Sequence, residues 1–205
     1  PLLFLHGAGG LFWDPYLGEL AKQYKVYAPY LPGVGNSTGL ESITDIWGLV
    51  LTYFDLLDAL EIDSINVMGH SMGGGGTLIA ANEHSEEIQA AIPFTPWEPG
   101  GPFDNITAPT LIIAGSADRI AGVDDHAWRH FQSIPESTTK VYMEIDGGNH
   151  YIADTDRGTD LATVGRYGIA WLKLYLDEDE RYRDFIYGEY QTPDAGKFSR
   201  YVTNP

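Results

Sequence analysis

The sequence predicts a single α/β domain, in which helices cover both faces of a mainly parallel sheet of about six strands. Short apolar and β-branched runs alternate with longer helix-like segments along almost the whole chain. Strands separated by helices need right-handed crossovers, which make neighbouring strands parallel. No internal repeat, low-complexity segment or linker divides the 205 residues, so we expect one domain over residues 1–205.

The expected strands and helices follow one another in regular order. Strands are predicted at residues 2–5, 25–30, 64–68, 90–94, 110–114 and 140–145. Helices are predicted at residues 16–23, 46–60, 77–84, 124–132 and 160–176. Ser42 or Thr44 is placed to cap the second helix. The segment after Asp177 has no clear periodicity, and four of its residues are expected to pin it against the body: Tyr182, Phe185, Ile186 and Tyr190.

The composition is strongly acidic. Twelve Lys and Arg residues against 29 Asp and Glu residues give a net charge of −17. Nucleic acids and anionic membranes bind through positive charge, so we expect neither as a partner, and no apolar run reaches membrane-spanning length. The absence of cysteine excludes thiol catalysis, disulfides and thiolate metal ligands. Because the chain opens on a strand at Pro1, we expect that an N-terminal piece, including any signal peptide, has been removed.

A sharp strand-to-helix turn is predicted at residues 69–73, which read Gly-His-Ser-Met-Gly. A buried strand precedes this run and a helix follows it. In that context a G-x-S-x-G motif holds its serine on a strained turn, with the Oγ exposed above the sheet edge. Glycines on both sides are needed because a Cβ there would clash across the turn. Ser71 is therefore the candidate nucleophile, and the backbone N–H of Met72 is a candidate oxyanion donor.

A nucleophilic serine needs a base and an orienting carboxylate. Functional groups of such sheets collect at the carboxyl ends of the strands. Asp118 lies shortly after the strand that ends at residue 114, and His150 follows the last predicted strand. We therefore predict Ser71, Asp118 and His150 as the catalytic residues, in the chain order associated with this type of turn.

Other acidic residues have simpler interpretations. Asp124 and Asp125 fit the first turn of a helix, where the dipole favours negative charge, and Asp146 fits a turn. The acidic residues beyond His150 fit a solvated loop better than a calcium site: Asp154, Asp156 and Asp160.

The remaining histidines also have interpretations other than a catalytic role. His6 fits a hydrogen-bonding loop anchor, His70 points away from substrate, and His84 ends a helix. His126 and His130 lie four residues apart on one predicted helix, a spacing that can bind metal, but no carboxylate is placed to complete the set. We predict no metal site.

The loop at residues 6–10 follows the first strand and supplies the second oxyanion donor, the N–H of Ala8. The glycine run at residues 73–76 is costly in a helix, by roughly 1 kcal/mol for each glycine relative to alanine. We attribute it to close approach of helix and sheet behind the serine. Neither glycine-rich segment has the spacing of a phosphate loop or a dinucleotide fingerprint, so we expect no cofactor.

Residues from about 65 to 185 resemble bacterial cutinases and PET-degrading polyester hydrolases, which have the α/β-hydrolase fold. The matching runs are residues 68–78, 91–97, 109–113, 118–121, 170–173 and 181–182. The resemblance implies the same three catalytic residues and places Trp97 in the wall of an ester-binding cleft. Residues 1 to about 60 look instead like general lid-bearing α/β-hydrolases, on the runs 4–9 and 31–37.

The chain departs from this family at several points. Polyester hydrolases usually have an aromatic residue where Ala8 lies, which clamps the aromatic ring of the polymer; Phe12 or Trp13 is the candidate substitute. The usual C-terminal cysteine pair is missing. The first two strands of the fold are also expected to be missing, so residues 2–5 should lie nearer to one sheet edge. Residues 72–117 leave no room for a lid domain, which predicts an open cleft.

These observations together predict a serine carboxylic-ester hydrolase that forms an acyl-enzyme and needs no cofactor. A polyester or cutin is the first substrate we expect, and short-chain acyl esters are the second. A perhydrolase or acyltransferase with the same three residues and a non-catalytic ligand-binding relative are the alternatives. We expect a secreted monomer.

Overall fold

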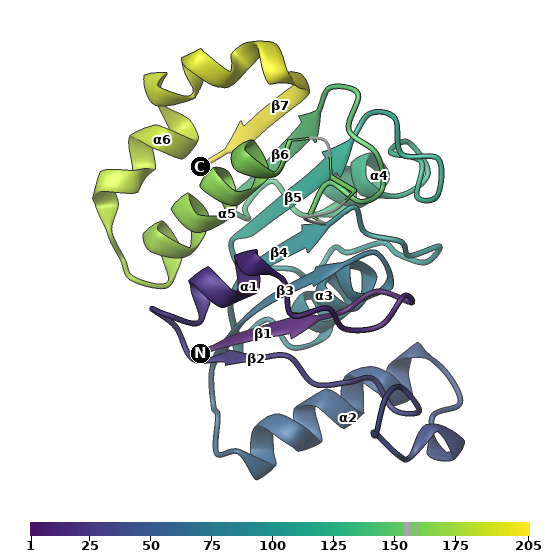
Figure 1. Ribbon diagram of the computed structural model, residues 1–205. Coiled ribbons are helices and arrows are strands. Elements are labelled where there is room, and N and C mark those ends of the chain that lie inside the picture. The colour runs from purple at the N-terminus through teal and green to yellow at the C-terminus, as the bar shows by residue number, and fades with distance from the viewer. Residues whose placement is uncertain (154–156, 159) are drawn as a thin grey trace.

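The computed structural model describes residues 1–153, 157–158 and 160–205, which form a seven-stranded sheet with helices on both faces (Figure 1). The strands are β1 (Leu2–Leu5), β2 (Val26–Tyr27), β3 (Ile65–His70), β4 (Ile88–Phe94), β5 (Thr110–Gly115), β6 (Lys140–Ile145) and β7 (Phe198–Asn204). Their order across the sheet is β2-β1-β3-β4-β5-β6-β7. Neighbouring strands are parallel except for β6 and β7, so the predicted mainly parallel α/β sheet is confirmed.

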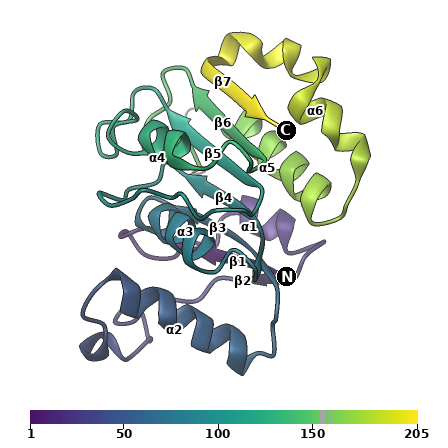
Figure 2. The same ribbon diagram turned by 180° about the vertical axis from the view of Figure 1, so that it is seen from behind.

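Helices cover both faces of the sheet, which Figures 1 and 2 show from opposite sides. One face carries α1 (Pro15–Leu20) and α5 (Leu161–Tyr175), and the other carries α2 (Ile46–Ala59), α3 (Met72–Glu83) and α4 (Ala127–Ser133). The remaining helical segments are η1 (Leu40–Ser42), η2 (Glu180–Tyr182), α6 (Arg183–Tyr187) and η3 (Glu189–Lys197). Within the described residues, no helix has the length and apolarity needed to cross a membrane.

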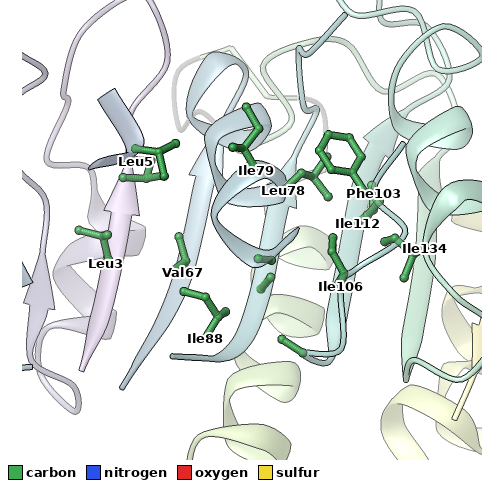
Figure 3. Close-up of a cluster of buried hydrophobic side chains, with 14 of the residues drawn as sticks. Leu3, Leu5, Val67, Leu78, Ile79, Ile88, Phe103, Ile106, Ile112 and Ile134 are labelled. Atoms are coloured by element: carbon green, nitrogen blue, oxygen red, sulfur yellow. The ribbon is translucent and has the colours of Figure 1, made fainter. Parts of the chain in front are cut away.

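Alternate residues of the central strands enter two separate cores. Leu3 of β1 and Val67 of β3 point to the face of α3, where Leu78 packs with them (Figure 3). Met68 belongs to the opposite core, which Trp171 of α5 helps to fill. Each side chain of this kind stabilises the fold by about 1.5–3 kcal/mol when fully buried. Burial on both faces explains why the strands have continuous apolar runs instead of alternating patterns.

The C-terminal segment is more regular than the irregular tail that its sequence suggests. Tyr182, Phe185 and Ile186 pack against the core beside α5, as expected. The chain then returns to the sheet as β7, which pairs with β6 in antiparallel register (Figure 1). Most β7 side chains are half-buried, so the strand lacks the apolar alternation that would mark it in the sequence. The side chain of Tyr190 lies outside the described residues.

Two boundaries near the N-terminal half differ from the predictions. The cap of α2 is Asp45, whose carboxylate accepts the N–H of Gly48 at 2.9 Å, and not Ser42 or Thr44. Asp is as good an N-cap as Ser, and it lies directly before the first helical residue. The second strand is also shorter than expected, since β2 comprises only Val26–Tyr27.

The helix α4 begins later than expected. Its first residue is Ala127, and His126 is its N-cap. Asp124 and Asp125 therefore lie in the turn before the helix and not in its first turn, which corrects their interpretation as helix N-terminal charges.

His130 of α4 is a buried base. Its side chain is only 1% exposed, and its ring packs edge-on against Phe103 with centroids 4.9 Å apart. Burial, and then the nearby charges of Arg129 and His126, lower the pKa of His130 to about 4. The unfolded chain takes up this proton below about pH 6.5, whereas the folded chain does so only near pH 4. The free energy of unfolding therefore falls as the pH drops through this window.

Replacing His130 by leucine is expected to remove this acid sensitivity. Between pH 7 and pH 4, the parent should lose up to roughly 3 kcal/mol more of its free energy of unfolding than His130→Leu loses. Urea unfolding of both proteins at half-unit pH steps measures the difference, which should be constant above pH 7. Parallel stability curves from pH 7 to pH 4 would contradict the prediction.

Candidate active site

Ser71 lies between the end of β3 and the first residue of α3, at the carboxyl edge of the sheet. Its φ of 58° and ψ of −118° cost an L-residue on the order of 1–3 kcal/mol. The Ser71 N–H donates to the carbonyl of Phe94 at 3.0 Å. The Ser71 carbonyl accepts the N–H groups of Gly75 and Trp97, each at 2.9 Å. These bonds hold the strained turn that the motif predicts.

The glycines around Ser71 let α3 approach the sheet at backbone distance. A Cβ on Gly73 would overlap the carbonyl group of Leu5 in β1. A Cβ on Gly69 would overlap the backbone of Gly73, and one on Gly75 would overlap the carbonyl oxygen of Trp97. Close packing against backbone atoms, predicted as the reason for the glycine run, is confirmed at these positions.

The structure brings the three predicted catalytic side chains together. His150 Nε2 lies 2.8 Å from Ser71 Oγ, and His150 Nδ1 lies 2.7 Å from Asp118 Oδ2. Asp118 Oδ1 accepts the N–H groups of Ile120 and Ala121, both at 2.8 Å. A carboxylate oxygen can only accept from Nδ1–H, which leaves Nε2 with a lone pair toward the serine hydroxyl. This is the tautomer that general-base chemistry needs.

The loops that carry Asp118 and His150 are packed backbone to backbone. The Ala117 N–H donates to the carbonyl of Gly148 at 2.8 Å. Gly115 lies so close to the same peptide that a Cβ on it would overlap the Gly148 carbonyl. The carboxylate and the imidazole are thus held by a single unit at the ends of β5 and β6.

The carbonyl oxygen of His150 receives two side-chain hydrogen bonds that the sequence analysis missed. His70 Nε2 donates to it at 2.8 Å, and the Thr95 hydroxyl donates at 2.9 Å. Thr95 is buried and has a φ of 37°, which is rare for a β-branched residue. His70 was expected to point away from substrate, and the structure adds that its ring contacts the His150 loop. The position of His70 directly before Ser71 was the sequence feature that could have indicated its contact with the site. No feature of the sequence pointed to Thr95.

The two candidate oxyanion donors lie beside Ser71. Met72 provides the first N–H of α3. Gly7 lies against the serine, since a Cβ on it would be 3.1 Å from Ser71 Cβ, and Ala8 follows in an exposed turn. The roles of Met72 and Ala8 as oxyanion donors stay predictions.

His6 and His84 have the structural roles expected from the sequence. The Leu31 N–H donates to His6 Nε2 at 3.0 Å, and His6 Nδ1 donates to the Gly7 carbonyl at 2.7 Å. His6 therefore anchors the loop that passes Ser71. His84 is the C-cap of α3.

Three aromatic side chains predicted to bind substrate are exposed to solvent. Trp97 is 41% exposed, and its ring centroid lies 6.1 Å from that of His126. Its backbone bond to Ser71 places it at the site. Phe12 and Trp13 are 69% and 54% exposed in the loop after Ala8. Contact of these three residues with substrate stays a prediction.

The described part of the chain contains no group of three or more His, Cys, Asp or Glu side chains that could hold a metal ion. The rings of His126 and His130 are 6.0 Å apart, with no third ligand of these types beside them in this part of the chain. Asp160 caps α5. Asp154 and Asp156, the other two members of the acidic cluster, lie outside the described residues.

Comparison with known families agrees with this geometry. Residues 51–204 match a family model described as PET hydrolase-like, and residues 1–99 match one described as alpha/beta hydrolase fold. The chain belongs to the PET hydrolase-like family. Its sheet and helices have the α/β-hydrolase fold. The resemblance inferred from the motifs is confirmed, including the different likeness of the N-terminal part.

Curated relatives match a shorter part of the chain. Cutinase est2 of Thermobifida alba is 43% identical over 127 residues, which are 62% of this chain and 41% of the relative. The cutinase of Thermobifida fusca strain YX is 43% identical over 128 residues, with the same two coverages. A bis(hydroxyethyl) terephthalate hydrolase of Streptomyces coelicolor is 41% identical over 128 residues, 62% of this chain and 40% of the relative. The chain thus matches about two fifths of the length of these relatives.

Proposed function

We propose that the protein is a serine carboxylic-ester hydrolase. Ser71 is the nucleophile, His150 the general base and Asp118 the carboxylate that orients the imidazole. The continuous hydrogen-bonded chain from Asp118 through His150 to Ser71 Oγ is the observation that supports this most strongly. The strained turn under Ser71 and the buried Asp118 carboxylate add to it, because both are held by backbone hydrogen bonds.

The reaction proceeds in two halves. In the first, Ser71 Oγ attacks the ester carbonyl while its proton moves to His150 Nε2, and the N–H groups of Met72 and Ala8 stabilise the oxyanion. The alcohol leaves with the proton from His150, and an acyl-serine ester remains. In the second half, water gives a proton to His150 and attacks the acyl group, so that the acid leaves and Ser71 Oγ regains its proton.

The substrate class that we propose is a bulky or polymeric carboxylic ester. Relatives are named cutinases and a bis(hydroxyethyl) terephthalate hydrolase, and cutin is a polyester while bis(hydroxyethyl) terephthalate is an aromatic diester. Only α3, β4, β5 and their connecting loops, the longest at residues 95–109, lie between Ser71 and Asp118 in this fully described stretch, so no lid domain covers the site from there. Trp97 offers an exposed aromatic wall beside the serine. We further propose secretion and a monomeric state.

Diethyl 4-nitrophenyl phosphate tests the nucleophile directly. Ser71 Oγ attacks phosphorus, its proton passes to His150, and 4-nitrophenolate leaves, so that a stable diethylphosphoryl-serine remains. We expect one 4-nitrophenolate per chain, loss of 4-nitrophenyl butyrate turnover in parallel with labelling, and the added mass on the peptide of Ser71. Full labelling at another residue, or turnover that survives complete labelling of Ser71, would overturn the proposal.

Thr95 is expected to act as a positioning residue in this reaction. Thr95→Val keeps the β-branched shape but removes one of the two hydrogen bonds to the His150 carbonyl. A net hydrogen bond of about 0.5–1.5 kcal/mol predicts a twofold to tenfold loss of kcat with little change in KM. Thr95→Ser keeps the hydroxyl and should restore kcat. A change confined to KM, or a serine variant as slow as valine, would contradict this role.

A further inference from the structure

Residues 98–100 form a turn directly after Trp97, beside the proposed ester-binding cleft. The turn belongs to no helix or strand, and side chains hold its backbone in place. Glu98 closes the turn from within, because its carboxylate Oε1 accepts the Gly100 N–H at 2.6 Å. The shape of the turn therefore depends on the side chains that contact it.

Arg129 of α4 holds this turn from outside. Its Nη2 donates to the carbonyl oxygens of Pro99 at 3.0 Å and Gly100 at 2.6 Å, and to that of Glu98 at the longer distance of 3.5 Å. Hydrogen bonds from a charged donor are stronger than those from a neutral one. One guanidinium group thus ties three successive carbonyls of the turn to α4.

Trp97 lies between this turn and the nucleophile. Its N–H donates to the Ser71 carbonyl at 2.9 Å, which fixes the peptide before it. The peptide after it leads into Glu98, whose N–H donates to His126 Nδ1 at 3.2 Å and whose carbonyl accepts from Arg129. The conformation that a side chain adopts depends on its own backbone. The exposed ring of Trp97 is therefore aimed by the serine turn on one side and by α4 on the other.

We propose that Arg129 is a positioning residue that determines how well the site accepts a bulky aromatic ester. By fixing the turn at residues 98–100, it holds the Trp97 ring along one side of a large acyl group. A small acyl group such as acetyl needs no such wall, so its hydrolysis does not depend on Arg129. This inference rests on the proposed ester hydrolysis, because it assigns the selectivity of the same site.

Arg129→Met tests the selectivity, since it removes the donors from an exposed side chain and leaves the core intact. The probes are bis(2-hydroxyethyl) terephthalate, which has a rigid aromatic acyl group, and 4-nitrophenyl acetate. We expect the ratio of kcat/KM for the terephthalate to that for the acetate to fall by about threefold to tenfold, as for one net hydrogen bond. The loss should lie in KM for the terephthalate, because the wall contributes binding and not proton transfer.

Two variants control this measurement. Arg129→Lys keeps the charge and can still donate to these carbonyls, so it should restore most of the parent ratio. Arg181→Met removes the same group from an exposed ion pair with Asp179 in the C-terminal segment, and it should keep the parent ratio. An unchanged ratio in Arg129→Met, or a lysine variant as poor as the methionine variant, would overturn the proposal.

Trp97→Ala tests whether Arg129 acts through the tryptophan. In this background, Arg129→Met should cause little further fall in the ratio, because residues that act through one contact are not additive. The same fall with and without the indole ring would mean that Arg129 supports the fold in general, and would overturn its role at Trp97.

A measurement without substrate separates this inference from the proposed reaction. In protein that contains 5-fluorotryptophan, the fluorine NMR resonance that disappears in Trp97→Phe belongs to Trp97. We expect it to shift or broaden in Arg129→Met and to keep its parent position in Arg129→Lys and Arg181→Met. An unmoved resonance in Arg129→Met would overturn the inference while ester hydrolysis stands. A folded parent that hydrolyses neither ester would instead overturn the proposed function, whereas the resonance would still show whether Arg129 orients the ring.

Discussion

Replacing Ser71 by alanine is expected to lower kcat for 4-nitrophenyl butyrate by about 10⁴- to 10⁶-fold, which is the range found when single triad residues are removed from other hydrolases. The reason is that, among the described residues, Ser71 Oγ is the hydroxyl that lies within hydrogen-bond distance of His150 Nε2, at 2.8 Å. Without Oγ, no acyl-enzyme forms, and the residual rate comes from substrate binding and oxyanion stabilisation alone. Initial rates over a range of ester concentrations give kcat and KM for both proteins.

Two further measurements control this prediction. The melting temperature of Ser71→Ala should stay close to that of the parent, because the strained turn is held by the backbone of residue 71 and not by its side chain. The double variant Ser71→Ala/His150→Ala should be no slower than Ser71→Ala alone, since residues that act as a unit are not additive. Near-parental kcat in folded Ser71→Ala would mean that another group is the nucleophile.

Substitution of Gly73 by alanine is expected to destabilise the protein more than any other single methyl group added to α3. The new Cβ would overlap the carbonyl of Leu5, which is backbone at the carboxyl end of β1 and cannot rotate away. Relief requires α3 to shift from β1, with a cost of at least about 3 kcal/mol by comparison with severe overpacking elsewhere. We expect Gly73→Ala to be insoluble or to unfold at much lower urea concentration than the parent.

Gly76→Ala is the matched control, three residues along the same helix. Its Cβ meets only the flexible Leu5 side chain at 3.4 Å, so the gain in helix propensity should dominate and stabilise by up to about 1 kcal/mol. Urea unfolding followed by circular dichroism measures both variants. Equal effects of the two substitutions would show that helix propensity, and not contact with β1, explains the glycine run.

The sequence predicted those parts of the structure whose residue pattern has a physical cause within a few residues of the chain. The turn around Ser71 was visible because glycines are required at fixed positions beside it, and the turn has the φ of 58° that such a motif implies. Asp118 and His150 followed from the rule that functional groups gather at strand ends. The central strands were visible because both their faces are buried.

The features that the sequence did not predict depend on contacts between segments that are distant along the chain. β7 was not predicted, because its half-buried edge position leaves no clear apolar pattern, and its pairing with β6 is set by the fold around it. Thr95 could not be recognised, because its role comes from a φ of 37° that aims the hydroxyl at a loop 55 residues away. The α2 cap was assigned to the wrong residue, since several polar residues precede that helix and only geometry decides among them.

The Gly115 and Gly148 contact joins the loop of the acid to the loop of the base. The acid and the base are thus carried together, and the hydroxyl is carried between β3 and α3. The loop at residues 98–108 carries none of the three catalytic side chains, so a change in it can alter the surface next to Trp97 while the proton-transfer distances stay the same. That separation makes this loop the natural place to alter selectivity by directed evolution.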